Sequence, residues 1–301
     1  MNYAKNLVFM IEPVSFRANE ETLKTNAFQK KPTNNENINH LAQEEFNNLI
    51  KTLNQYGIQT HVEKDLVERD TPDSIFPNNW VSFHHGVVVL YPMQAENRRR
   101  ERSLNFIHHI AEKNKLSLDQ VIDLSHEESN GKYLEGTGSI VFDHYNKKAY
   151  ASLSERTDQS LLEDICKTLK YEAIYFNAVD ENNFPIYHTN VMMAIGEKFA
   201  VICLDSIKNI EEKEKIIQSL KTNNKEIIEI SYDQMNHFCG NILQLKGNDD
   251  YVIAMSKTAF NHFTEAQKIQ LEQHGKIAYS DISTIETHGG GSVRCMICEV
   301  A

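Results

Sequence analysis

Short apolar runs closed by Gly- or Asn-containing turns recur along the chain, and each is followed by a stretch with helical apolar spacing. The runs that begin near residues 80, 139, 190 and 241 predict β-hairpins. After each hairpin the pattern predicts one helix and then one more strand. The predicted hairpins cover 80–91, 139–152, 190–204 and 241–255, the helices 97–115, 158–169, 209–221 and 264–274, and the strands 120–124, 171–177, 225–230 and 276–280.

A fifth unit can be assembled from the two ends of the chain. It combines a strand over 6–11, a helix over 40–55 and a strand over 59–63 with a closing strand over 292–300. Repeated units of this kind form rings or solenoids, and pairing the terminal strands would remove the exposed edges of a ring. We therefore predict an α/β fold, a five-bladed α/β propeller of ββαβ units closed by the N- and C-terminal strands, as a single domain over residues 1–301. The alternative is a mixed α/β domain whose regularity is accidental.

Composition narrows the class of protein. The chain has 301 residues, of which 41% are hydrophobic, and its 31 Lys and Arg against 42 Asp and Glu give a net charge of −11. An acidic surface repels phosphate backbones, so we expect no nucleic-acid partner. No apolar stretch approaches the roughly 18 residues of a membrane span. The odd number of cysteines, five, argues against a disulfide framework and predicts a reduced, cytoplasmic protein. Whether it forms a homo-oligomer stays open.

A short polar motif precedes each predicted hairpin and the closing strand. If the units surround one axis, these motifs converge on a single pocket, where a cysteine, a histidine and a carboxylate would supply a nucleophile, an acid and base, and an orienting group. The motifs are FPNNW at 76–80, LEGTG at 134–138, YHTN at 187–190, NHFCGN at 236–241 and HGGGSVRC at 288–295.

Cys295 is the candidate nucleophile of this pocket. Three glycines before it allow close backbone approach to a ligand, and the neighbouring Arg294 would favour the thiolate over the thiol. The alternatives are a buried structural cysteine and a C-x-x-C pair with Cys298. His188 and Glu135 are candidates through their positions in the repeat, and Glu135 enters an apolar hairpin, where a carboxylate needs a partner.

Other charged side chains carry weaker signals. Arg98 and Arg99 lie in a basic run, and Arg156 follows the second hairpin; each is either part of a solvated surface or a clamp for a substrate carboxylate. The histidine pairs at 84–85 and 108–109 have no nearby carboxylate with clear metal-ligand spacing, so the sequence predicts no metal site.

The ordered motifs Glu135-Gly136, His188-Thr189-Asn190 and 289–296 resemble those of the guanidino-group-modifying enzymes, the superfamily of arginine deiminase, dimethylarginine hydrolase and glycine amidinotransferase. The resemblance covers nearly the whole chain and implies the pentein fold, a five-bladed α/β propeller. It also implies that Cys295 is the nucleophile, that His188 is the general acid and base, and that Glu135 binds a substrate nitrogen and supports the histidine. By the same resemblance Arg156 binds the substrate α-carboxylate, together with Arg98 or Arg99.

Two departures from the arginine deiminase pattern concern the substrate. That pattern has F-x-R-D where this chain has Phe76-Pro77-Asn78-Asn79, and H-x-D where it has His188-Thr189-Asn190. A carboxylate accepts hydrogen bonds and carries charge, which suits a guanidinium with five N–H donors, whereas an amide is neutral and both donates and accepts. Asn79 and Asn190 therefore favour a neutral ureido group. Further candidate substrate-binding residues are Phe76, Asn78 and Arg294, and which of Asn78 and Asn79 faces the substrate stays open.

The FPNNW and EGTGS motifs also resemble the citrulline-utilisation hydrolases, or citrulline ureidases. This resemblance implies a hydrolase that cleaves the ureido C–N bond of L-citrulline, an amino-acid substrate, through an S-carbamoyl-cysteine intermediate. The products would be ornithine, ammonia and carbon dioxide, and the chemistry requires no cofactor. One alternative is an arginine deiminase or dihydrolase, and another is a non-catalytic ligand-binding protein on the same fold.

Overall fold

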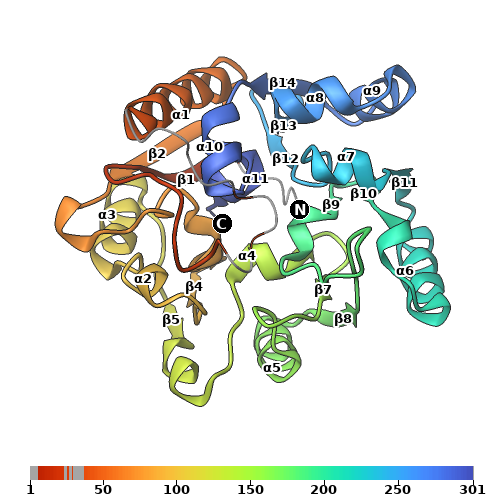
Figure 1. Ribbon diagram of the computed structural model, residues 1–301, viewed down its shortest axis with the longest axis horizontal. Helices are drawn as coiled ribbons and strands as arrows, with labels where there is room; N and C mark the ends of the chain where they lie inside the picture. Colours follow the sequence, from red (N-terminus) through yellow and green to blue (C-terminus); the bar gives the residue numbers. More distant parts are fainter. Residues whose placement is uncertain (1–5, 24–25, 27–28, 30–36, 301) are drawn as a thin grey trace.

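The computed structural model describes residues 6–23, 26, 29 and 37–300. Within these residues, five three-stranded sheets surround a common centre, and each has helices on its outer side (Figure 1). We call each sheet with its helices a blade. In every blade the middle strand runs antiparallel to the inner strand and parallel to the outer strand. The parallel partner is reached through a helix, as a parallel connection requires. The predicted propeller of five ββαβ units is confirmed.

The blades follow the chain in order. Their inner, middle and outer strands are β15 (Cys298–Glu299), β1 (Leu7–Glu12) and β2 (Gln59–Lys64); β3 (Val81–His84), β4 (Val87–Leu90) and β5 (Gln120–Asp123); β6 (Val141–Asp143), β7 (Lys148–Ser152) and β8 (Glu172–Phe176); β9 (Met193–Ile195), β10 (Phe199–Ile202) and β11 (Glu226–Glu229); and β12 (Leu243–Lys246), β13 (Tyr251–Ser256) and β14 (Lys276–Ser280).

The first blade joins the two ends of the chain. Strand β1 pairs with β15 through Val8 opposite Glu299 and Phe9 opposite Cys298, and it pairs in parallel with β2. The predicted closure by the terminal strands is therefore present. The inner strand is much shorter than the predicted 292–300, because Val293–Met296 forms a helical turn, α11, before the strand begins.

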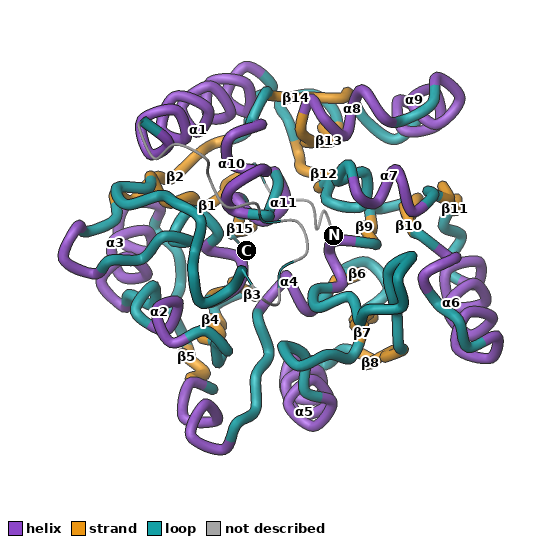
Figure 2. Tube along the Cα trace, viewed as in Figure 1, coloured by secondary structure: helices purple, strands orange, loops and turns teal. Residues whose placement is uncertain are grey.

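Helices lie on the outer side of the sheets (Figure 2). Their buried residues are mostly apolar. In α1 (Ile38–Gln55), for example, Ala42, Phe46, Leu49 and Leu53 recur at helical spacing and are buried. The other long helices are α3 (Leu104–Asn114), α5 (Gln159–Leu169), α6 (Ile210–Thr222) and α9 (Glu265–Glu272). Shorter ones are α2 (Glu96–Arg99), α4 (Gly136–Ser139), α7 (Tyr232–Asn236), α8 (Lys257–His262) and α10 (Ser283–Gly289).

The predicted helix over 97–115 is wrong in one respect, since it is divided into α2 and α3. Ser103 caps the start of α3, where its hydroxyl accepts a hydrogen bond from the Phe106 N–H. The break allows the arginines before it to face different partners. Arg98 points into the centre of the molecule, whereas Arg102 contacts Glu128 at a separate site.

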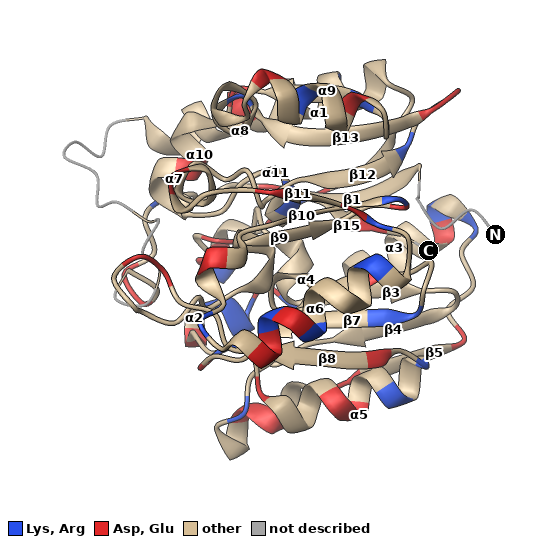
Figure 3. Ribbon diagram, turned by 90° about the vertical axis from the view of Figure 1, so that its right-hand side faces the viewer, with Lys and Arg blue, Asp and Glu red and all other residues tan. Residues whose placement is uncertain are grey.

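Charged residues are frequent on outer helices such as α5 and α6 (Figure 3), whereas the middle strand β10 (FAVI) has none. The middle strand β10 is buried along its whole length. Among the residues that the structure describes, none of the helices has the length and apolar character of a bilayer-spanning segment.

The site is built on short helical turns that precede the inner strands. Residues Pro77–Asn79, Gly136–Ser139, Thr189–Val191 and Val293–Met296 each form such a turn, at equivalent positions of four blades. Three of these turns come from the FPNNW, LEGTG and YHTN motifs, and the fourth carries Cys295. Because the inner ends of the blades face one another, the turns meet at the centre of the ring (Figure 1).

Candidate active site

One cavity at this centre brings the predicted chemical residues together. It contains about 430 Å³ of space not occupied by atoms, including space that is open to solvent. Cys295 and His188 line it, together with Asn79, Asn190 and Phe76. Arg98 and Arg156 line it as well, and other lining residues are Thr22, Asn26, Asp73, Tyr187, Val191, Phe238, Asn241 and Gly289–Gly291.

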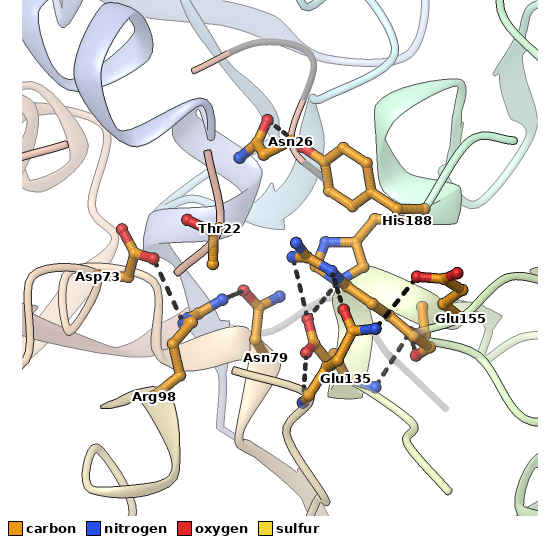
Figure 4. Close-up of polar contacts among 12 residues, drawn as sticks. Thr22, Asn26, Asp73, Asn79, Arg98, Glu135, Glu155 and His188 are labelled. Carbon is orange, nitrogen blue, oxygen red and sulfur yellow. Dashed lines mark hydrogen bonds and ion pairs between the residues drawn. The ribbon is translucent and has the colours of Figure 1, made fainter. Parts of the chain in front are cut away.

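His188 and Glu135 form a buried pair. His188 Nε2 lies 2.7 Å from Glu135 Oε2, and the other carboxylate oxygen accepts a hydrogen bond from the Gln94 N–H (Figure 4). Arg156 Nη1 lies 3.6 Å from Glu135 Oε2. Burial alone would raise the pKa of Glu135, but Arg156 and His188 together hold it below its ordinary value, so the carboxylate is ionised. Glu135 therefore fixes the Nε2–H tautomer and leaves His188 Nδ1 as the exchangeable nitrogen.

The same pair determines the charge of the histidine at rest. Burial lowers the pKa of His188, and the hydrogen bond to Glu135 only partly offsets this effect. The imidazole is therefore neutral near pH 7 and can accept a proton. Glu135 is fully buried and is not one of the residues that line the cavity. It contacts His188 from behind and therefore acts as a positioning group for the imidazole.

Two asparagine amides converge on the Cys295 thiol. Asn190 Nδ2 lies 3.4 Å and Asn241 Nδ2 lies 3.3 Å from Sγ. The orientation of the Asn241 amide is set by unambiguous partners, because its Oδ1 accepts from the Arg294 N–H and its Nδ2 also donates to the Asn190 carbonyl. Two N–H donors directed at one sulfur atom stabilise a thiolate. Asn241 was not predicted as a site residue, although its motif occupies the equivalent position of the fourth repeat.

Arg294 lies elsewhere, which corrects its prediction as a substrate-binding residue. Its guanidinium donates to the Ile297 carbonyl and to Glu299, and the side chain does not line the cavity that holds Cys295. Consecutive residues of the α11 turn point in different directions. The Arg294 guanidinium therefore does not contact the Cys295 thiol, although the two residues are adjacent in the sequence. The amides of Asn190 and Asn241 contact the sulfur instead.

The two asparagines of the FPNNW motif point in different directions. Asn79 lines the cavity, whereas Asn78 does not and donates from Nδ2 to Thr137. Arg98 Nη1 donates to Asn79 Oδ1 at 2.8 Å, which turns Asn79 Nδ2 away from the arginine. Gly138 makes room for this amide, because a Cβ there would lie 2.4 Å from Asn79 Nδ2 and 2.9 Å from His188 Nδ1.

The candidate arginines Arg98 and Arg99 have different partners. Arg98 lines the cavity, but Nε and Nη2 form a bidentate pair with Glu101 and Nη1 binds Asn79, so its described role is to hold Asn79 rather than to receive a carboxylate. Arg99 binds the carbonyls of Met93 and Gln94 and does not line the cavity.

Arg156 is the arginine whose surroundings suit a ligand. Its Nε donates to Gln94 Oε1, and its guanidinium lies 4.8 Å from the centre of the Tyr187 ring. These contacts hold the planar group in place at the cavity wall.

Asp73 is a cavity residue that the sequence analysis missed. Its Oδ2 accepts from Asn19 and lies 3.7 Å from Arg98 Nε, while its buried Oδ1 has no hydrogen-bond partner among the described residues. Burial raises the pKa of Asp73 above its ordinary value. The signal available in the sequence was weak, since Asp73 lies in a loop three residues before Phe76 rather than in one of the repeated turns.

The glycines before Cys295 also allow close packing, in addition to the predicted close approach of the backbone to a ligand. A Cβ at Gly289 or Gly291 would lie 2.7 or 2.8 Å from the Phe76 ring. Phe76 therefore packs directly on the backbone that leads to the nucleophile, and both line the same cavity.

A five-bladed ring with Cys, His and Glu at its centre defines the pentein superfamily of guanidino-group-modifying enzymes, and this protein is one of its hydrolases. A family model described as eukaryotic N,N-dimethylarginine dimethylhydrolase matches residues 12–301, and the chain belongs to this family. No curated protein matches the chain.

Solved structures share the fold at low sequence identity. The N-terminal domain of ArgZ, an arginine dihydrolase from the ornithine–ammonia cycle in Cyanobacteria solved with its substrate, is 17% identical with a TM-score of 0.76, and the match covers 98% of each chain. AgrE in complex with L-arginine is 15% identical with a TM-score of 0.76 over 98% of this chain and 40% of that one. DDAH from Pseudomonas aeruginosa, in complex with citrulline, is 16% identical with a TM-score of 0.65 over 98% and 99%.

Proposed function

We propose that this protein hydrolyses the ureido group of L-citrulline to ornithine, ammonia and carbon dioxide. One observation carries the choice of substrate: the cavity offers a buried donor, Asn79 Nδ2, and a buried acceptor, Asn190 Oδ1, neither of which has a hydrogen-bond partner among the residues that the structure describes. A ureido group presents a carbonyl acceptor and N–H donors, so it can satisfy both amides. A guanidinium has five N–H donors and no acceptor, so Asn79 Nδ2 would face another donor. A buried donor without an acceptor costs about 1–3 kcal/mol.

The reaction begins at Cys295. The thiolate attacks the ureido carbon, a C–S bond forms, and one C–N bond breaks. His188 takes the proton of the Cys295 thiol at Nδ1, which generates the thiolate, and then delivers this proton to the departing nitrogen, leaving an S-carbamoyl-cysteine. Ionised Glu135 keeps His188 oriented and stabilises the imidazolium that forms.

Water completes the cycle. His188 removes a proton from water, the hydroxide adds to the carbamoyl carbon, and the C–S bond breaks to regenerate the thiolate. The carbamate that is released decomposes to an amine and carbon dioxide, and the sum is citrulline plus water to ornithine, ammonia and carbon dioxide.

The amino-acid end of citrulline carries a carboxylate and an ammonium group. Arg156 supplies a fixed guanidinium for the carboxylate. Asp73 Oδ1, which has no hydrogen-bond partner within the described part of the chain, supplies an acceptor for the ammonium group. Holding both groups aligns the distant ureido carbon with the thiol, and such positioning can remove several kcal/mol of the barrier.

An arginine hydrolase is the second candidate, and Asp73 is the observation that favours it. If Asp73 Oδ1 contacts the reacting group instead, it supplies the counter-charge that a guanidinium needs. Asp73→Asn distinguishes the two arrangements. Contact with the ammonium group predicts losses on both citrulline and arginine, whereas contact with a guanidinium predicts a loss on arginine alone.

The direct test is to incubate the purified protein separately with L-citrulline, L-arginine and N,N-dimethylarginine and to measure ornithine, citrulline and ammonia. We expect ornithine and ammonia in equal amounts from citrulline only, and none from the Cys295→Ala variant. Citrulline formed from either guanidino compound, or ornithine formed from arginine, would assign the protein to the guanidine branch. Turnover of citrulline by Cys295→Ala would refute the mechanism.

A further inference from the structure

A second group of ligand-type side chains lies outside the cavity, where the first blade meets the second. His61 and Glu63 are two residues apart on β2 and therefore share one face of that strand. His109 reaches them from α3 of the next blade. His61 Nε2 lies 2.7 Å from Glu63 Oε1, and His109 Nδ1 contacts the same carboxylate oxygen. The two imidazole rings lie edge to face, with their centres 5.5 Å apart.

Two imidazoles and one carboxylate form a typical ligand set for zinc and similar divalent ions. One ligand atom from each side chain lies within 4.8 Å of the others. Ligands at about 2.0–2.2 Å from one Zn²⁺ are at most about 4.4 Å apart, so a small rotation of one side chain is sufficient. His109, whose side chain is 45% exposed, has room to rotate, and its exposure also gives an ion access.

We propose that His61, Glu63 and His109 bind one Zn²⁺ ion, with water completing the coordination, and that the ion ties β2 to α3. The proposal departs from the expectation from the sequence, which found no carboxylate with clear metal-ligand spacing near the histidine pair at 108–109. The carboxylate and the second imidazole lie more than forty residues earlier in the chain, and only the packing of adjacent blades brings them to the helix. None of these three residues lines the cavity that holds Cys295, and the proposal does not depend on the proposed reaction.

Asn114 limits how tightly the ion can be held. Its Nδ2 donates to His61 Nδ1 at 3.1 Å and to the Ile110 carbonyl at 2.9 Å, so His61 carries its proton on Nε2 and donates it to Glu63. When zinc binds at Nε2, the imidazole proton must reside on Nδ1, where it would face the Asn114 donor. Asn114 must therefore turn away, and its replacement by a residue without a donor should strengthen binding.

The test is zinc binding by equilibrium dialysis on tag-free protein in the Cys295→Ala background, which removes the active-site thiol as a competing ligand. We expect one Zn²⁺ per chain, and a melting temperature that rises with zinc concentration because the ion binds the folded state. His109→Ala should weaken binding at least about tenfold. His108→Ala is the matched control, since it removes an exposed imidazole from the adjacent position of the same helix and should leave binding unchanged.

Two further measurements make the proposal falsifiable even if a variant folds poorly. Cobalt should give the intense visible absorption of a tetrahedral site, and His109→Ala should abolish that band. Asn114→Ala should tighten zinc binding severalfold, a gain that a merely structural hydrogen-bond cluster does not predict. Retention of no zinc, or equal binding by His109→Ala and His108→Ala, would overturn the proposal and leave a hydrogen-bonded cluster.

Discussion

Asn79→Asp is the change that tests the choice of substrate most directly. Arg98 holds Asn79 Oδ1, and an aspartate at this position can keep that contact. The Nδ2–H donor is then replaced by a carboxylate oxygen, which cannot donate to a ureido carbonyl but can accept from a guanidinium. The substitution preserves the shape of the side chain and alters only the charge and the donor pattern.

The magnitude follows from two effects. The lost neutral hydrogen bond is worth about 0.5–1.5 kcal/mol, and the carboxylate left facing a carbonyl oxygen costs a further 1–3 kcal/mol or so. Together these amount to about 1.5–4.5 kcal/mol, which lowers kcat/KM for citrulline roughly 13- to 2,000-fold. Activity on arginine should rise relative to citrulline, because a buried carboxylate can pair with the guanidinium.

The assay is ornithine formation over a range of citrulline and arginine concentrations, with the melting temperature measured as a check on folding. Asn78→Asp is the control, because it adds the same charge to the neighbouring buried residue, which does not line the cavity. If Asn79→Asp leaves kcat/KM for citrulline within threefold of the original, or favours citrulline over arginine more strongly than before, the hydrogen-bond argument is wrong.

Three other expectations concern the nucleophile and its base. Asn241→Asp should slow iodoacetamide alkylation of Cys295 at neutral pH by roughly 10- to 150-fold, since a hydrogen bond to a charged group is worth about 1.5–3 kcal/mol. The control variant Asn236→Asp, at the end of α7 and outside the lining of the Cys295 cavity, should not slow it. Equal rates for Asn241→Asp and the original protein would show that Asn241 does not stabilise the thiolate. His188→Ala should leave little or no turnover of citrulline, and full activity would remove it from the mechanism. Glu135→Gln should lower the melting temperature at pH 7. The folded-state pKa of Glu135 lies below its ordinary value of 4.5. The original protein should therefore be more stable than Glu135→Gln above pH 4.5, and this difference in stability should shrink as the pH falls below 4.5. A stability difference that is independent of pH from 7 to 3 would contradict this assignment.

Much of the fold was accessible from local patterns. Strand, turn and helix signals repeat within each unit, and the elements of a blade lie close together in the chain, so the four internal units were predicted nearly to their ends. The closing blade was predicted because the N-terminal unit lacked one strand, which the C-terminal residues 292–300 could supply. The division of the helix over 97–115 was not, because the cap at Ser103 is a local signal that competes with a continuous apolar pattern.

The sequence by itself determined the ring of five units and the chemical types at its centre, because repeated motifs at equivalent positions must converge when the ring closes. Only the tertiary structure decided which side chains meet. Asn241 reaches Cys295 from another blade, Asp73 enters the cavity from a loop, and Arg294 points away from the thiol next to it. A side chain's direction depends on the turn that carries it and on partners distant in sequence, and neither leaves a periodic pattern along the chain.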